Sequence, residues 1–275
     1  MKNAIGVMQG RLVPKYKGLY QAHPVGYWQD EFKVAESIGL DCIEFILDFN
    51  DTEKNPLLQT NGIADIQEEI NNTGVNVHTI CADYFMEAPL HTVDSNIAYS
   101  SYDIMVHLIG NASMLGISDI VLPCVDQSSL RDTKAIDRFV EVLTPLLKLA
   151  ENTGLNISLE TDLAPKAFAD LLAKFSSSRV TVNYDIGNSA ALGFDPVEEL
   201  TAYGERITDI HIKDRILGGG PVVLGQGNAD FALFFSALSK QDYSGPFIMQ
   251  AYRDDEGVAV FKSQLVWVTT YLEQI

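Results

Sequence analysis

The chain has 275 residues, of which 47% are hydrophobic and 20% charged, so it can build a large core and does not have the composition of a disordered protein. Acidic residues outnumber basic ones by 37 to 19, and the resulting formal charge of −18 would repel a phosphate backbone. These totals argue against nucleic acid as a partner. No apolar stretch approaches the roughly 20 residues that a membrane span requires, so we also expect no membrane association.

The N-terminal segment "MKNAIGVMQGRL" lacks the apolar core and small-residue cleavage pattern of a secretory signal. Cys42, Cys81 and Cys124 are odd in number and lie in apolar runs, which is typical of reduced thiols packed in a core. Both features favour a cytoplasmic location.

Eight short runs rich in Ile, Val, Leu and Phe recur along the chain, and each has the length of a buried strand. In chain order they are 4–8, 42–47, 75–80, 119–123, 155–160, 180–185, 207–212 and 247–251. Segments with helical periodicity separate them, including 27–40, 62–75, 133–155 and 228–245. Each of these helices is expected to end near a glycine, and Pro145 predicts a kink in the third.

Strands that read as continuous apolar runs are buried on both faces, which is typical of a parallel sheet covered by helices. Eight strand–helix units without a linker predict a single (β/α)₈ TIM barrel domain over residues 1–275. An open doubly wound sheet is the competing fold, but no G-x-G-x-x-G turn follows the first predicted strand. The glycine-rich segment 217–230 is either a long loop at the barrel mouth or a plain surface hairpin.

Polar residues end or nearly end four consecutive predicted strands. They are Glu160, Asp185, His211 and Gln250. Because the carboxyl ends of barrel strands meet at one face, these side chains are expected to converge there. Two carboxylates, one imidazole and one amide oxygen suit a divalent ion, Mn²⁺ or Mg²⁺ first and Co²⁺ or Zn²⁺ second. The alternative is a salt-bridged polar cluster at the barrel rim.

Taken together, the motifs "SLET", "NYDIGN", "DIHIKD" and "GPFIMQ" resemble those of the sugar isomerase/epimerase superfamily of xylose-isomerase-like barrels. The similarity begins at "GVMQGR" and includes "GQGNADFALFFSAL" and "YSGPF", so it covers nearly the whole chain. It is greatest to the sugar and sugar-phosphate epimerases. The resemblance implies a small-molecule sugar or sugar phosphate as partner and metal ligands at the four strand-end residues. It also implies that substrate hydroxyls are held by Glu44, His78, Asn188 and Lys213.

In the epimerases that the chain resembles, the fifth and eighth strands both end in a glutamate. One glutamate removes a proton next to the ketone, and the other returns it on the opposite face. Gln250 departs from this pattern, because an amide has no useful basicity near neutral pH. Glu160 is then the one remaining base, and a second face would need another group, for which His78 and Asp83 are the candidates. Arg253 or Arg11 could hold a substrate phosphate, or be surface ion-pair partners.

The sequence therefore predicts a metal-dependent sugar or sugar-phosphate isomerase or epimerase, with Glu160 and His78 as catalytic residues and Arg253 as a further substrate contact. One alternative is a metal-dependent dehydratase of a keto-inositol or keto-sugar. Another is a sugar-binding barrel that has lost its chemistry. A DNA-repair nuclease of the same barrel type is disfavoured. Such a site needs a basic face and more histidines than the five in this acidic chain. Barrels of this kind often pair, so a homo-oligomer is compatible with this prediction.

Overall fold

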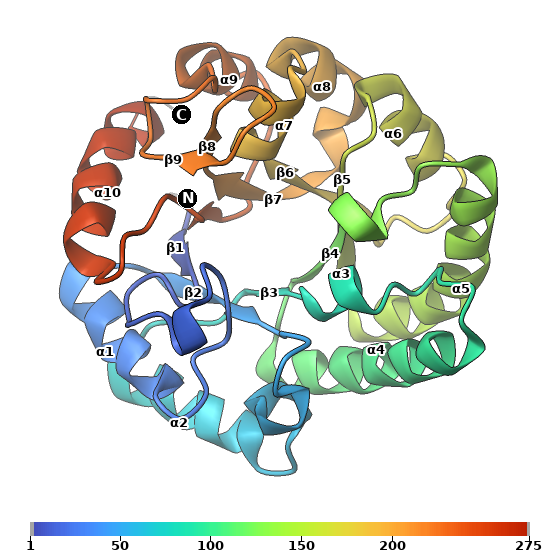
Figure 1. The fold of residues 1–275 in the computed structure, drawn as a ribbon, viewed down its shortest axis with the longest axis horizontal. Coiled ribbons are helices and arrows are strands. Elements are labelled where there is room, and N and C mark those ends of the chain that lie inside the picture. The colour runs from blue at the N-terminus through green and yellow to red at the C-terminus, as the bar shows by residue number, and fades with distance from the viewer. Residues whose placement is uncertain (1–2, 274–275) are drawn as a thin grey trace.

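The computed structural model describes residues 3–273 and shows a closed barrel of parallel strands surrounded by helices (Figure 1). The strand order around the barrel is β1-β10-β7-β6-β5-β4-β3-β2. The barrel strands are β1 (Ile5–Met8), β2 (Cys42–Ile46), β3 (Thr79–Cys81), β4 (Asp119–Cys124), β5 (Asn156–Thr161), β6 (Val180–Asp185), β7 (Ile207–Ile212) and β10 (Phe247–Met249). The predicted (β/α)₈ barrel is confirmed.

The predicted helices are present, and further helices complete the ring around the barrel. The helices are α1 (Trp28–Ile38), α2 (Gly62–Thr73), α3 (Tyr84–Glu87), α4 (Ser95–Leu115), α5 (Thr133–Thr153), α6 (Pro165–Leu172), α7 (Ile186–Leu192), α8 (Pro196–Tyr203), α9 (Phe231–Leu238) and α10 (Val258–Leu272). α1 and α5 end at Gly39 and Gly154, whose φ angles of 82° and 77° favour a residue without a Cβ. α5 continues through Pro145. Within residues 3–273, no helix has the length and apolar character needed to cross a membrane.

The core has two parts. The larger part lies between the strands and the surrounding helices and is built from aliphatic and aromatic side chains. A smaller apolar cluster lies inside the barrel and consists of Met8, Cys42, Ile46, Cys81, Val121 and Ile248. The barrel interior also holds buried polar side chains, among them Glu44, Asp209 and His211. All three cysteines are buried and free, as predicted for core thiols.

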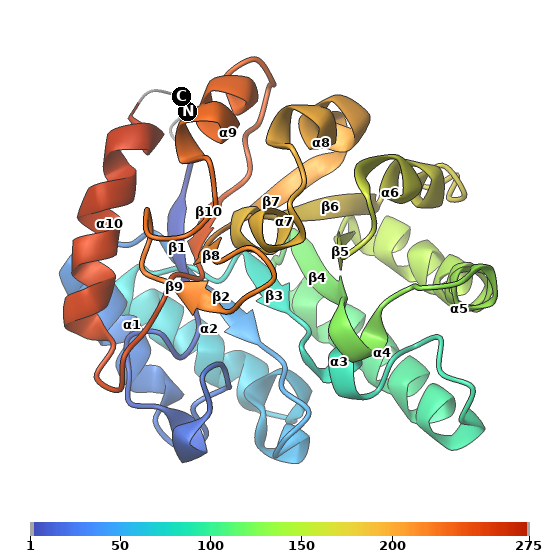
Figure 2. The ribbon, with the colours of Figure 1, turned by 45° about the horizontal axis from the view of Figure 1, so that its top comes forward.

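The glycine-rich segment after β7 forms a small antiparallel hairpin of β8 (Asp214–Arg215) and β9 (Pro221–Val222). Figures 1 and 2 both show this hairpin inside the ring of helices. The buried Asp214 carboxylate fixes the segment by accepting from the backbone N–H groups of Gly225, Gly227 and Ala229 at 2.9, 2.8 and 3.1 Å. A Cβ at position 227 would lie 2.1 Å from Asp214 Oδ1, so glycine is required there.

Candidate active site

A cavity of about 290 Å³ lies at the carboxyl ends of the barrel strands, at the lower end of the range for small-molecule sites. Side chains from several strand ends and from the loops beyond them line it. They include Gln21, Asp83, Glu160, Asn188, Lys213 and Gln250. The hairpin after β7 borders the same cavity through Arg215 and Gly218. This is the face where barrel enzymes place their chemistry.

Three of the four predicted metal ligands lie together in this region. Glu160, Asp185 and His211 come from β5, β6 and β7, are buried, and offer ligand atoms that all lie within 4.8 Å of one another. Asp185 is held in place because its Oδ1 accepts from the backbone N–H of Asn188 at 2.8 Å, at the start of α7. The expected convergence of these strand ends is therefore present.

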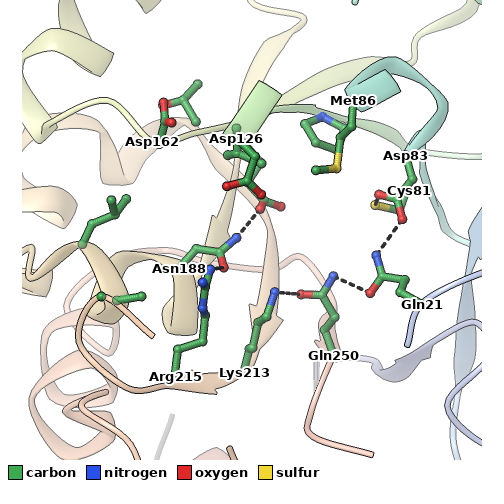
Figure 3. A pocket seen from close by; sticks show the side chains of 17 residues that line it. Gln21, Cys81, Asp83, Met86, Asp126, Asp162, Asn188, Lys213, Arg215 and Gln250 are labelled. Carbon is green, nitrogen blue, oxygen red and sulfur yellow. Dashed lines mark hydrogen bonds between the residues drawn. The ribbon is translucent and has the colours of Figure 1, made fainter. Parts of the chain in front are cut away.

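Gln250 reaches the same cluster through Lys213. The Lys213 ammonium donates to Gln250 Oε1 at 2.9 Å (Figure 3). It also donates to Asp185 Oδ2 at 3.2 Å, so oxygens at the ends of two strands converge on one positive charge. Asp185 and Gln250 thus hold a positively charged group, the Lys213 ammonium, between their oxygens. Oxygen donors from Glu160, Asp185 and Gln250 with one imidazole form a set that suits a divalent ion.

The orientation of the Gln250 amide is set by a buried arginine. Arg11 donates to Gln21 Oε1 at 2.8 Å, and because a guanidinium has only donors, the Gln21 oxygen must face it. The same oxygen accepts from Gln250 Nε2 at 3.1 Å. Gln250 therefore turns its NH₂ group toward Gln21 and its carbonyl oxygen toward Lys213 and the ligand cluster. A glutamate at this position would have no proton to donate to Gln21 unless it were protonated.

Glu160 is surrounded by donors. Asn188 Nδ2 donates to its Oε1 at 2.6 Å, and Asn183 Nδ2 donates to its Oε2 at 2.7 Å. Burial alone would raise the pKa of Glu160, but His211, Lys213 and Asn183 outweigh it and lower the pKa below its ordinary value. The carboxylate is therefore ionised and able to accept a proton from a bound molecule.

Glu44 lies beneath the site and not at its mouth. It is fully buried inside the barrel, where it accepts from Thr79 Oγ1 at 2.6 Å and lies 2.7 Å from His211 Nε2. It is not among the residues that line the cavity. The predicted contact with substrate is not supported, because β2 continues two residues beyond Glu44. Instead Glu44 orients His211 so that Nδ1 faces Glu160, at 3.5 Å from its Oε2.

His78 lies at the other end of the barrel. It precedes β3, and its backbone oxygen accepts from the N–H of Ser118, just before β4 begins. The carboxyl end of β3 presents Asp83 to the cavity in its place. The position of His78 therefore does not support the catalytic role that the sequence suggested.

Arg253 is a structural residue. Its guanidinium is buried and donates to the backbone oxygens of Gly10, Val13 and Asp254, and it does not line the cavity. Arg11 is likewise buried, against Ala251, Tyr20 and Gln21. Neither arginine is free to hold a substrate phosphate, so the predicted substrate contact at Arg253 is not supported.

We expect Arg253→Met to lower the free energy of unfolding by about 2–4 kcal/mol, because buried carbonyl oxygens lose a charged donor. Urea denaturation measures the loss. Arg131→Met is the control, since Arg131 is exposed and donates to the Asp126 backbone oxygen, and its loss should change stability little. An unchanged stability for Arg253→Met, with weaker substrate binding, would restore the predicted role.

Several residues of the cavity were missed from the sequence, among them Arg215, Gln21, Asp126 and Asp162. Arg215 lines the cavity and donates to Asn188 Oδ1 at 2.8 Å, and its place two residues after Lys213 was an available signal. Gln21 lies in the long segment after β1, and nothing in its neighbourhood marks it. The cavity wall also carries Asp126 and Asp162, so carboxylates outnumber cations around it. Asn188 and Lys213 line the cavity, and their contact with substrate stays a prediction.

Comparison with known proteins agrees with this fold. A family model described as "Xylose isomerase-like TIM barrel" matches residues 32–271. L-ribulose-5-phosphate 3-epimerase UlaE of Escherichia coli (strain K12) is 26% identical over 255 residues, covering 86% of this chain and 87% of UlaE. A solved structure of L-ribulose 3-epimerase superimposes with a TM-score of 0.77 at 17% identity, covering 100% of this chain and 95% of that one. The IolI protein with a bound zinc atom gives 0.75 at 17% identity, covering 98% and 97%. The chain belongs to the xylose isomerase-like TIM barrel family.

Proposed function

We propose that this protein is a metal-dependent sugar or sugar-phosphate epimerase or isomerase that moves a proton on a carbon next to a carbonyl group. The observation that carries the proposal is the clustering of Glu160, Asp185 and His211 beside the cavity, which Glu160 and Gln250 line. Lys213 links the Gln250 carbonyl oxygen to Asp185 of this cluster. The epimerase names of UlaE and of the L-ribulose 3-epimerase structure support the same class of reaction.

The four side chains would hold one divalent ion, Mn²⁺ or Mg²⁺ by the preference of their oxygen atoms and Co²⁺ or Zn²⁺ as alternatives. The zinc atom in the IolI structure, which has the same fold, supports a bound metal in this proposal. When bound, such an ion polarises the substrate carbonyl and makes the neighbouring C–H bond more acidic. Glu44 contributes by fixing the His211 ring so that its Nδ1 faces the cluster.

Glu160 is the base in this proposal. Its carboxylate is ionised, lines the cavity, and is held at both oxygens by Asn183 and Asn188, so its direction is fixed before substrate binds. It takes the proton from the carbon next to the carbonyl, and the C–H electron pair becomes the double bond of an enediolate. Lys213 and Arg215 offer N–H donors to substrate oxygens along the same wall.

We expect removal of divalent metal to abolish proton exchange with solvent. The purified protein is treated with EDTA, dialysed, and incubated in D₂O with L-ribulose, D-tagatose, D-allulose or L-ribulose 5-phosphate, and hydrogen exchange is followed by NMR. Exchange next to the carbonyl should vanish with EDTA and return when Mn²⁺ is added. Metal content measured on the same samples should be close to one ion per chain. The proposal fails if the metal-loaded protein exchanges hydrogen in none of these ketoses.

A dehydratase is the second candidate, because Gln250 leaves one glutamate base and one metal site, which suffice for loss of water next to a ketone. It would remove the α-proton through Glu160 and expel a β-hydroxyl group from a keto-inositol or keto-sugar. Growth of enone absorbance, with no epimer formed, would favour this reading over epimerisation.

A further inference from the structure

Epimerisation requires a proton to leave one face of a carbon and return on the other, and Gln250 has no basic group to take part. We propose that Asp83, at the carboxyl end of β3, is the second catalytic residue and transfers the proton on the face opposite Glu160. This inference rests on the proposed function and decides between an epimerase and an isomerase. An enzyme with one proton-transfer group on each face of the substrate carbon is an epimerase.

The Asp83 carboxylate is directed into the site. The residue precedes α3, where an aspartate often caps the helix, yet its side chain makes no capping hydrogen bond. Oδ2 accepts from Gln21 Nε2 at 2.7 Å, and Oδ1 accepts from the Cys81 thiol at 3.2 Å. Both contacts come from residues that also line the cavity, and Asp83 itself remains partly exposed there. The carboxylate is thus held in place and reachable by a bound molecule.

Asp83 and Glu160 approach the cavity from different sides. Figure 3 shows Asp83 across the cavity from Asn188, the residue whose amide binds Glu160. Asp126 and Asp162 also line the cavity, but they follow β4 and β5 and lie on the side of Asn188 in Figure 3. Of the labelled carboxylates in Figure 3, Asp83 is the one on the side opposite Asn188, and Asn188 is the residue that holds Glu160.

Asp83 is also linked to the position where the related epimerases carry their second glutamate. Gln21 donates to Asp83 and accepts from Gln250, so one bridging amide connects the two positions. Arg11 fixes the direction of that bridge by binding Gln21 Oε1. Compared with the epimerases that it resembles, this chain has an amide at position 250 and a carboxylate at position 83 of the same hydrogen-bond network. The Gln250 amide keeps its oxygen for the metal.

The protonation state of Asp83 suits transfer in both directions near neutral pH. Burial raises its pKa to about 6, reinforced by the negative charges of Asp48 and Glu160 and opposed by its hydrogen bonds from Gln21 and Cys81. Arg11, bonded to the far side of Gln21, is a further charge in electrostatic reach. A general acid or base is most effective when its pKa lies near the working pH. Burial holds the pKa of Cys81 well above its usual value, so this thiol stays a neutral donor.

The step is balanced without any further reactant. Glu160 takes the proton, the C–H electron pair forms the enediolate carbon–carbon double bond, and the carbonyl π electrons move to oxygen. Protonated Asp83 then gives its proton to the opposite face of the same carbon, and the carbonyl re-forms. The cycle ends with Glu160 protonated and Asp83 ionised, and exchange of one proton each with water restores the starting state.

The test is hydrogen exchange in each of the two epimers separately. Wild-type and Asp83→Asn proteins, both loaded with Mn²⁺, are incubated in D₂O with each member of the pair L-ribulose and L-xylulose, and of the pair D-fructose and D-allulose. Wild type should exchange both members of a pair and interconvert them. Asp83→Asn should still exchange the one epimer whose proton faces Glu160, with retained configuration, while exchange in the other epimer and interconversion fall by about 10²-fold or more.

Controls separate this role from others. Asp170→Asn removes an exposed carboxylate on α6 that does not line the cavity, and it should keep exchange in both epimers. Gln250→Glu should give no increase in interconversion, because the second group is already present. Interconversion by Asp83→Asn close to the wild-type rate overturns the inference, and so does a gain on Gln250→Glu. If wild type exchanges neither epimer, the proposed function itself fails.

A readout independent of activity is the pH dependence of folding. The folded-state pKa of about 6 exceeds the ordinary value of 3.8, so Asp83 contributes stability below pH 4 that is lost as pH rises through 6. Asp83→Asn should therefore gain stability relative to wild type between pH 5 and pH 8 in urea denaturation. A difference that does not vary with pH would mean that Asp83 is ionised throughout and has no proton to give.

Discussion

Glu160→Gln should lose proton exchange by about 10²–10⁴-fold, the range expected when a positioned general base is removed. The amide keeps the size of the side chain and one oxygen for a metal, but it accepts no proton. It also leaves an NH₂ group facing either Asn183 or Asn188, both of which donate to the carboxylate in the native protein. NMR detection of deuterium wash-in next to the carbonyl measures the loss.

Two further measurements show whether this loss comes from the base or from the metal site. Mn²⁺ affinity by calorimetry should fall for Glu160→Gln, and the exchange assay is therefore run at saturating Mn²⁺, where only the missing base remains. Glu198→Gln, which alters an exposed glutamate on α8, is the matched control and should behave as wild type. Exchange that survives at saturating metal would assign the base to another residue.

Most of the barrel could be predicted from the sequence because its strands are buried on both faces and therefore read as continuous apolar runs. The exception is β3, which was predicted at 75–80 and lies at Thr79–Cys81. Of the predicted residues before it, Asn76 makes only an isolated bridge to Cys42. This small shift has a functional consequence, since it moves His78 away from the mouth and brings Asp83 to it.

The candidate site could be predicted only where a residue stands at a strand end. Asp185 meets that condition, and Glu160 and His211 each lie one residue before the end of β5 and β7. An apolar run in the sequence does not show how deep each of its side chains lies inside the barrel. Glu44 could therefore not be distinguished from a residue at the mouth. The contacts that fix Gln250 join it to Gln21, which is 229 residues away in the chain. Hydrogen bonds of that span leave no local pattern in the sequence.

Glu44→Gln should weaken Mn²⁺ binding by about 10–100-fold, the effect expected when the partner of a metal-binding histidine is changed. In the native protein the Glu44 carboxylate lies 2.7 Å from His211 Nε2 and accepts from Thr79. His211 and Thr79 outweigh the effect of burial and lower the pKa of Glu44, so it is an ionised acceptor. An amide has a single acceptor oxygen for these two donors, and the His211 ring loses its fixed tautomer. Calorimetric titration with Mn²⁺ measures the change.

The same variant separates a residue that positions His211 from one that touches substrate. If Glu44 acts only through His211, saturating Mn²⁺ should restore exchange at an unchanged KM for the ketose. A substrate contact, as the sequence suggested, would instead raise KM and leave Mn²⁺ affinity at its native value. Thr79→Val is the graded control, since it removes one donor to Glu44 and keeps the carboxylate beside His211. It should weaken Mn²⁺ binding less than Glu44→Gln does, because the buried negative charge that orients the imidazole is still present.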